Sequence, residues 1–168
     1  MRIILRWTHR KAELAYPVPP APPTAVLQSW FKSSGVVRVH DGWDAEVAAF
    51  APAAIAGTWP QLEALIPEKI PSLTHALIVL ARPGDELLTK AQREHLWKTF
   101  RVPVFQQVVT RGGELLAAEC EAHDGLHMES SKFVVIGLPL DRTPCGCGRK
   151  TPRMKLPVLK ASAAESSV

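Results

Sequence analysis

No run of apolar residues in this sequence approaches the roughly 20 residues that a membrane-spanning helix needs. The first residues, MRIILRWTHRK, lack the apolar core and the small-residue cleavage site of a secretory signal peptide. Hydrophobic residues are not scarce: they make up 46% of the 168 residues, against 21% charged, which is typical of a folded domain and not of a disordered chain. We therefore expect a cytoplasmic protein that does not bind membranes.

Cysteine is scarce. Three cysteines are too few for a disulfide framework, and an odd number cannot pair completely. All three lie in the last third of the chain: Cys120 within AECEAHDGLH, and Cys145 and Cys147 within PCGCGRK. Because Cys120 is also close to His123 and His127, metal binding and thiol chemistry are the functions to consider.

Zinc is the metal that this combination favours. A structural zinc site takes four soft or borderline ligands in a tetrahedron, commonly from two loops. The predicted ligands are three thiolates and one imidazole, from Cys120, His127, Cys145 and Cys147. Four protein ligands leave no position open for water, so the predicted metal is structural and not catalytic. His123 is the alternative fourth ligand.

The residues around the predicted ligands leave other interpretations open. C-x-C is tighter than the usual C-x2-C of zinc sites, so Cys120 can instead be a buried strand residue and the C-x-C an exposed turn. Nearby basic residues also allow a redox role for the paired thiols. In favour of the metal, three glycines are expected to turn the ligands toward one point by taking positive φ values: Gly125, Gly146 and Gly148. The neighbouring acidic residues are expected to be solvated or to accept a hydrogen bond from the imidazole: Glu119, Glu121, Asp124 and Glu129.

A strand, a helix and a second strand follow one another in the middle of the chain. Residues 75–81, HALIVLA, form a continuous apolar run, which is typical of a strand buried on both faces. Thr89 and Gln92 form a capping box for a helix whose apolar side is expected to consist of Leu96, Trp97 and Phe100. Residues 102–109 are typical of another strand, so the order predicts a βαβ unit with a right-handed crossover.

Shorter elements are expected on both sides of this unit. Before it, the pattern predicts a helix that Thr24 caps and Gly35 ends, a strand at 36–40, a helix at 44–56 and a short helix capped by Thr58. Pro52 is expected either to break the helix at 44–56 or to start a second turn. After it, residues 115–120 and 133–138 are typical of antiparallel strands. The predicted fold class is α/β: a small βαβ-containing sheet with a C-terminal antiparallel, zinc-bound β region.

We expect one domain over residues 1–154. Residues 17–23 are a proline-rich linker or strap, residues 115–150 are the zinc-binding region, and residues 155–168 are a flexible tail. The formal net charge of +4 comes from basic residues at the two ends of the chain, including Arg149, Lys150, Arg153, Lys155 and Lys160. They do not form one contiguous stripe, so nucleic-acid binding by this C-terminal basic segment is a lesser hypothesis than solubilising surface charge.

Three short motifs in the second half of the chain are distinctive together: Glu119-Cys120, Gly125-Leu126-His127 and Cys145-Gly146-Cys147-Gly148. With the residues around them, from about residue 59 to residue 154, they resemble the phenylacetate-coenzyme A ligase-like branch of the adenylate-forming enzymes. Some members of this branch carry a structural zinc, and the resemblance places Cys120, His127, Cys145 and Cys147 at its ligand positions.

The sequence also departs from these ligases. Where they have an aromatic-Gly-x-Thr-Glu motif that holds AMP and magnesium, this chain has Phe105-Gln106-Gln107-Val108-Val109. The phosphate loop, the ribose-binding aspartate and the catalytic lysine are missing from these 168 residues as well. The leading hypothesis is therefore a non-catalytic, zinc-stabilised module, a reduced ligase relative that binds a protein partner or a small acyl or aryl ligand. The alternative is a ligase accessory or degenerate enzyme that binds acyl-adenylate or coenzyme A beside residues 105–110.

Overall fold

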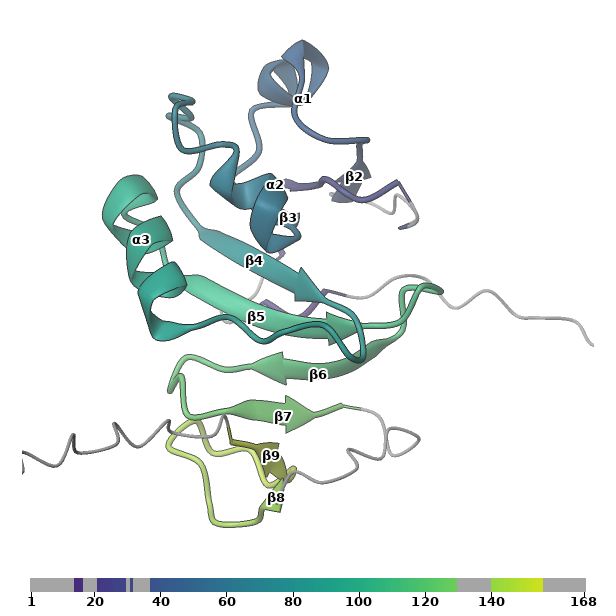
Figure 1. Cartoon of the computed structure of the whole chain (residues 1–168), viewed down its shortest axis with the longest axis vertical. Coiled ribbons are helices and arrows are strands. Elements are labelled where there is room, and N and C mark those ends of the chain that lie inside the picture. Colours follow the sequence, from purple (N-terminus) through teal and green to yellow (C-terminus); the bar gives the residue numbers. More distant parts are fainter. Residues whose placement is uncertain (1–13, 17–20, 30, 32–36, 130–139, 156–168) are drawn as a thin grey trace, which may run out of the picture.

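The computed structural model describes residues 14–16, 21–29, 31, 37–129 and 140–155. This part of the chain forms a single nine-stranded sheet with helices against it (Figure 1). The strands are β1 (Thr24–Val26), β2 (Val37–Val39), β3 (Ala54–Gly57), β4 (Ala76–Ala81), β5 (Val104–Val109), β6 (Leu115–Glu119), β7 (Leu126–Met128), β8 (Leu140–Asp141) and β9 (Arg153–Met154). The helices are α1 (Ala45–Phe50), α2 (Trp59–Glu63) and α3 (Lys90–Phe100).

The sheet has a parallel half and an antiparallel half. Its strand order is β2-β1-β3-β4-β5-β6-β7-β9-β8. The strands from β2 to β5 pair in parallel, whereas β5 pairs antiparallel with β6, and every later pairing is antiparallel too. The predicted α/β class, with its βαβ unit and its antiparallel C-terminal region, is confirmed, although the sheet is larger than expected.

Strand β4 lies inside the parallel half, between β3 and β5, and corresponds to the apolar run at residues 75–81. All six of its residues are buried, and it pairs on both sides, with β3 and with β5. Because side chains alternate along a strand, Leu77 and Val79 pack under helices α2 and α3, while Ile78 and Leu80 face the opposite side. The predicted doubly buried strand is confirmed.

Helix α3 begins at the predicted capping box. The Gln92 backbone N–H donates to Thr89 Oγ1 at 3.2 Å, and the Thr89 backbone N–H donates to Gln92 Oε1 at 2.9 Å. Leu96 is fully buried, but Trp97 is 47% exposed, so its prediction as an apolar-side residue was wrong. Adjacent residues differ by about 100° around a helix, and burying Leu96 therefore turns Trp97 outward, where the Arg101 guanidinium lies over its ring.

Two segments that were predicted to be helical contain strands. The helix expected from Thr24 is wrong, because Thr24–Val26 is strand β1, fully buried between β2 and β3. The helix expected at 44–56 is right only to Phe50: Ala51 takes a left-handed conformation with φ 51°, and β3 follows. Short apolar segments carry no clear period, so pairing on both sides decided their conformation.

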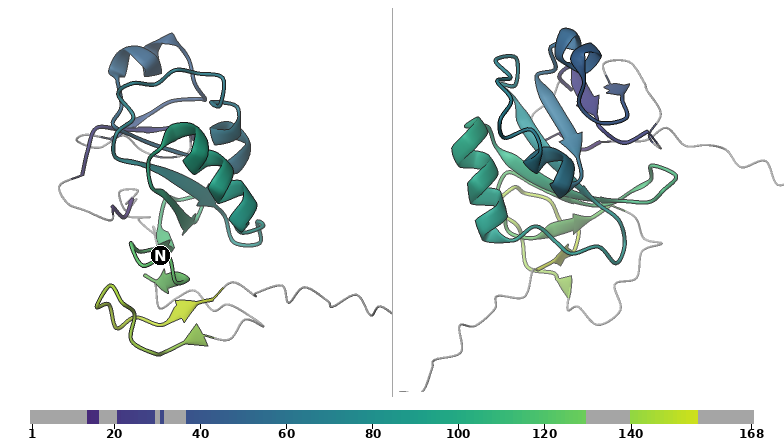
Figure 2. Two further views of the ribbon diagram at one scale, coloured as in Figure 1. Left: turned by 90° about the vertical axis from the view of Figure 1, so that its left-hand side faces the viewer. Right: turned by 45° about the horizontal axis from the view of Figure 1, so that its top comes forward.

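Helices cover only part of this sheet. In Figure 2, α2 and α3 lie over β3, β4 and β5, and among the described residues no helix lies over β7, β9 or β8. Of the predicted segments, residues 17–20 of the proline-rich strap, the strand at 133–138 and residues 156–168 of the tail lie outside the described ranges. The antiparallel end of the sheet carries the predicted metal ligands.

Candidate metal centre and ligand pocket

Four residues predicted as metal ligands come together at the antiparallel end of the sheet. Cys120 directly follows β6, His127 is in β7, and the two cysteines of the C-x-C lie in the loop between β8 and β9. One ligand atom from each, in Cys120, His127, Cys145 and Cys147, lies within 4.8 Å of all the others. Three of these residues are buried and Cys147 is partly buried. The cluster is therefore capable of holding a metal ion.

The interatomic distances match a small tetrahedral ion. The Sγ atoms of Cys120 and Cys145 are 3.7 Å apart, and Cys147 Sγ is 3.4 Å from His127 Nε2. In a tetrahedron with metal–sulfur bonds of about 2.3 Å and metal–nitrogen bonds of about 2.0 Å, those edges would be about 3.8 Å and about 3.5 Å. The donor set and its spacing thus fit the predicted tetrahedral site.

Hydrogen bonding to Thr151 orients the imidazole of His127. Its Nδ1 atom lies 2.9 Å from Thr151 Oγ1 and 3.3 Å from the Thr151 carbonyl oxygen. A carbonyl oxygen can only accept, so Nδ1 carries the proton and Nε2 presents its lone pair to the cysteines. Metal-bound histidines are held in this way, by a partner on the second ring nitrogen.

His123, the alternative ligand, lies outside the cluster. Its Nδ1 atom is 3.2 Å from Glu119 Oε1, and its ring stacks on Phe105 with the centroids 4.9 Å apart. The side chain is 40% exposed. Of the two histidines, the structure brings only His127 to the cysteines.

Two glycine turns bring the ligand loops to the cluster. Gly125 has φ +88° and lies so close to β9 that a Cβ atom there would be 2.7 Å from the carbonyl oxygen of Met154. Gly148 has φ +81°, and its N–H donates to the carbonyl of Cys145 at 2.9 Å. The prediction of positive φ is confirmed for these two glycines and wrong for Gly146, which does not take a positive φ.

The crowded thiols differ in acidity. Burial raises the pKa of the Cys120 thiol to about 12, whereas the backbone N–H of Cys147 lowers the pKa of Cys145 to about 6. Placing three thiolates side by side in a buried site is unfavourable without a cation, because like charges repel strongly there. A bound divalent cation would reverse this preference and hold all three as thiolates.

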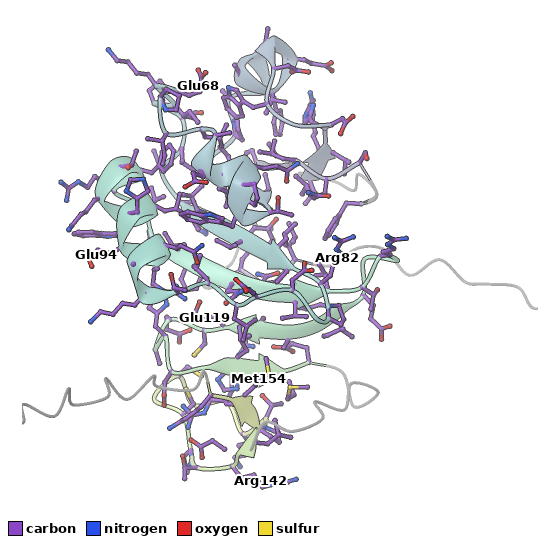
Figure 3. The ribbon with its side chains drawn as sticks, in the orientation of Figure 1. Glu68, Arg82, Glu94, Glu119, Arg142 and Met154 are labelled. Carbon is purple, nitrogen blue, oxygen red and sulfur yellow. The ribbon has the colours of Figure 1, made fainter. Side chains whose placement is uncertain are left out.

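The acidic residues near the ligands are mostly paired. Glu119, labelled in Figure 3, is 8% exposed and accepts hydrogen bonds at 2.9 Å from Arg93 Nη2 and from the Gln106 backbone N–H. It was predicted to be solvated or bonded to the imidazole ligand, and it is neither. Its charge instead fastens helix α3 to strands β5 and β6.

The role of Arg153 could not be predicted from the sequence. It was assigned to a basic surface segment, but it is 1% exposed and forms ion pairs with Asp124 and Asp141. A Pro-Arg-Met triplet after a cysteine loop carries no local signal of burial. Only its strand pairing with β7 and β8 places it inside.

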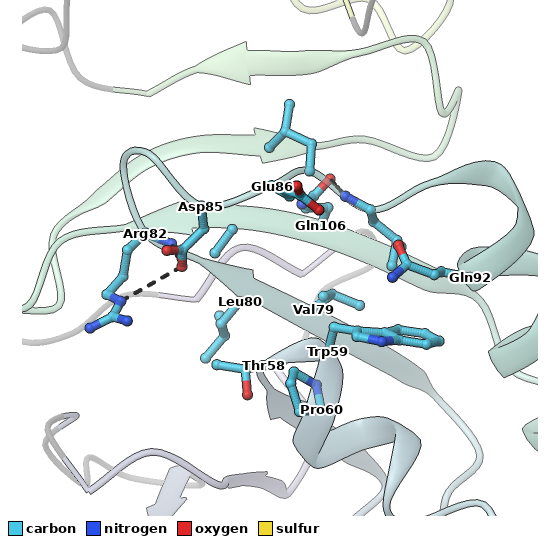
Figure 4. Close-up of a pocket in the computed structure, with 13 residues that line it drawn as sticks. Thr58, Trp59, Pro60, Val79, Leu80, Arg82, Asp85, Glu86, Gln92 and Gln106 are labelled. Carbon is cyan, nitrogen blue, oxygen red and sulfur yellow. Dashed lines mark hydrogen bonds and ion pairs between the residues drawn. The ribbon is translucent and has the colours of Figure 1, made fainter. Parts of the chain in front are cut away.

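A separate pocket lies at the carboxyl ends of β3 and β4 (Figure 4). It has a volume of about 440 Å³. Its wall combines apolar side chains with a few polar groups, including Trp59, Val79, Leu80, Leu87, Thr58 and Gln106. Ligands of open α/β sheets bind at such strand ends.

Gln106 gives this pocket an unsatisfied hydrogen-bond donor. The residue is 1% exposed, and its Oε1 atom accepts from the Leu88 backbone N–H at 3.1 Å. Its Nε2 atom is buried without a partner among the residues that the structure describes. Buried polar groups normally have a partner, so a donor in this position is available to a ligand atom.

Comparisons with known proteins found a likeness of fold to a solved structure. No protein-family model matches the chain, and no curated protein matches it. Among solved structures, it is similar to an open conformation of 2-hydroxyisobutyryl-CoA ligase in complex with 2-HIB-AMP and CoA, with a TM-score of 0.58 and 13% identity. The fold is distantly adenylate-forming-like. The match covers 82% of this chain but only 44% of the ligase, so the chain spans less than half of that protein's length.

The comparison confirms the expected ligase-like scaffold at the level of the fold. At 13% identity it extends no further than the fold. In the part of the chain that the structure describes, no helix has the length and apolar character needed to cross a membrane.

Proposed function

We propose that this chain is a non-catalytic, zinc-stabilised α/β module, a reduced relative of acyl- and aryl-CoA ligases that binds a small ligand or a protein partner. The observation that carries the proposal is the cluster of three cysteines and one histidine, with ligand atoms within 4.8 Å of one another. Thiolate and imidazole are the ligands that structural zinc prefers. Because all four positions are protein groups, the metal has no site for substrate or water and serves the fold.

A metal would stabilise the antiparallel end of the sheet. Strand β7 has three residues, and β8 and β9 have two each. Among the described residues, the buried apolar cluster here is Ala81, Val108, Leu116, Ala117, Leu126 and Met154, with Leu87 and Met128 partly buried against it. Such short strands make few hydrogen bonds to one another, and a structural metal bound by their loops adds stabilisation.

Two histidine variants test the zinc site. We expect purified His127→Asn to lose its zinc, measured by mass spectrometry of the metal, and to unfold at a lower temperature. His123→Asn is the matched control, since it removes an imidazole four residues away that lies outside the cluster, and asparagine tolerates its φ of 49°. Equal zinc content and equal stability in both variants would contradict the proposed ligand set.

The pocket at the ends of β3 and β4 supports a second function, binding of an acyl-adenylate or coenzyme A-type ligand. The buried Gln106 Nε2 atom can donate to a carbonyl, carboxylate or phosphate oxygen, while Trp59 and Val79 offer apolar contact. The structurally similar 2-hydroxyisobutyryl-CoA ligase was solved in complex with 2-HIB-AMP and CoA. Since the sequence lacks the motifs that bind ATP and magnesium, binding without adenylation is proposed.

Two glutamine variants separate this function from mere stability. We expect AMP, coenzyme A or an acyl-adenylate analogue at millimolar concentration to raise the unfolding temperature of the chain, and Gln106→Leu to abolish that rise. Gln107→Leu is the control, because Gln107 is equally buried but bonds the backbone of Ala15 instead of lining the pocket. An absent shift with every ligand would count against this second function.

Nucleic-acid binding is not part of the proposal, since the described basic residues of the C-terminal segment are largely neutralised. Arg149 pairs with Glu129 at 2.5 Å, and Lys155 pairs with Asp141 at 2.8 Å. Little free positive charge is left there to contact phosphates. We expect weak, salt-sensitive retention on DNA or RNA at most. Reduced thiols in the proposed metal site favour the cytoplasm as the compartment.

A further inference from the structure

We propose that Arg153 is the positioning residue of the metal centre, an inference that rests on the zinc site proposed above. Its guanidinium reaches two loops at once from strand β9. Nη1 donates to the carbonyl oxygen of Asp124 at 3.1 Å and also to its carboxylate. Nη2 donates to Asp141 Oδ2 at 3.0 Å and to the carbonyl and hydroxyl oxygens of Thr143 at 3.2 and 3.1 Å.

Each partner of Arg153 belongs to a segment that carries a ligand. Asp124 lies between Cys120 and His127 in the turn that joins β6 to β7. Thr143 precedes Cys145 by two residues, and its backbone N–H donates to Asp141 Oδ1 at 2.8 Å, which fixes the start of that loop.

The strand pairing joins Arg153 to the ligands directly. In the ladder between β7 and β9, Arg153 is the residue opposite His127, and between β8 and β9 it is opposite Asp141. One buried side chain is therefore bonded to both ligand loops, while its backbone is in register with the imidazole ligand. Only a planar guanidinium has enough fixed donors for this arrangement.

This network would hold the ligand atoms together before a metal arrives. The Arg153 side chain is 1% exposed and Asp141 is 16% exposed, so their charges are shielded from water and their geometry is constrained. Without the Arg153 side chain, the turn containing Asp124 and the loop containing Thr143 would be joined here by the short backbone pairing of β9 with β7 and β8, and metal binding would have to order both. Partners that orient metal ligands typically contribute about 10- to 100-fold in metal affinity.

The test compares two arginine variants of the full chain. We expect Arg153→Met to bind zinc about 10- to 100-fold more weakly than the wild type in competition with a chromogenic chelator. The matched control is Arg149→Met, which removes an arginine closer in sequence to Cys147 but in an exposed pair with Glu129. Its zinc affinity should stay within about two-fold of the wild type.

A spectroscopic readout separates positioning from general destabilisation. Cobalt(II) bound at a tetrahedral site has ligand-field bands that report its geometry, and Arg153→Met should change their intensity at a temperature where circular dichroism shows the protein folded. If Arg153→Met does not fold, Asp141→Ala tests the same network with the arginine retained. It should weaken zinc binding in the same direction, by about ten-fold or less.

The outcomes distinguish the two proposals. Wild-type protein that holds zinc, together with a folded Arg153→Met of equal affinity and an unchanged cobalt spectrum, would overturn the role of Arg153 and leave the zinc site standing. If Arg153→Met is unfolded, an Asp141→Ala variant with the zinc affinity of the wild type would likewise overturn the role of Arg153. Wild-type protein that binds no zinc at all would overturn both.

Discussion

The tight turn at Gly125 allows the most quantitative prediction about stability. Alanine at this position would have to keep φ near +88°, which costs about 1 to 2 kcal/mol for a residue with a Cβ atom. That Cβ atom would also lie 2.7 Å from the carbonyl oxygen of Met154, a backbone atom that cannot move without shifting β9. Relieving such an overlap typically costs about 1 to 3 kcal/mol more. We therefore expect Gly125→Ala to lower the free energy of unfolding by about 2 to 5 kcal/mol.

Gly84 offers a control for the backbone part of this cost. It has φ +92°, but nothing lies within 4 Å of a Cβ atom built there. Gly84→Ala should therefore lose only about 1 to 2 kcal/mol. Urea denaturation of both variants gives the difference, and each kcal/mol corresponds to about 2 to 4 °C in Tm for a chain of this size. If Gly125→Ala were no less stable than Gly84→Ala, the close approach of the β6–β7 turn to β9 would be refuted.

Three further substitutions test single contacts. Thr151→Val removes the hydroxyl beside the His127 ring and should weaken zinc binding about ten-fold in chelator competition; unchanged affinity would show that this contact does not orient the ligand. Glu119→Gln leaves the Arg93 guanidinium without a counter-charge and should lower the free energy of unfolding by about 2 to 4 kcal/mol. Urea denaturation measures this loss, and an unchanged urea midpoint would refute the importance of the pair. The hydrogen bond from Lys155 lowers the pKa of Asp141, so its stabilisation is present above the unfolded pKa of about 3.9 and is lost as the pH falls below it. Asp141→Asn should accordingly lose less stability than the wild type when the pH falls below about 4. If the free energies of unfolding of both proteins, measured with urea, fell equally between about pH 4 and about pH 2, this prediction would be contradicted.

Local sequence signals were sufficient for the centre of the fold. The capping box at Thr89 and the apolar run that became β4 each encode their element within a few residues. The cluster of possible metal ligands was also predictable, because the chain has only three cysteines and all of them lie in the same third of the sequence as His127.

Features that depend on pairing between distant segments could not be predicted. The apolar pattern after Thr24 predicted a helix, but Thr24–Val26 is a strand because β2 and β3 flank it. Arg153 looks like a surface cation in its own segment, and its burial follows from the pairing of β9 with β7 and β8. Trp97 is the opposite case to Arg153: an apolar residue that was expected to be buried lies at the surface. Its position on the helix, one residue after the buried Leu96, decides its exposure.

Metal analysis of the purified wild-type chain is the decisive test of the zinc site. We expect about one zinc per chain after dialysis against metal-free buffer, with all three thiols protected from a thiol reagent until a strong chelator removes the metal. A cooperatively folded protein that contains no zinc, does not take it up, and has the same unfolding temperature with and without chelator would contradict a zinc site at these four residues.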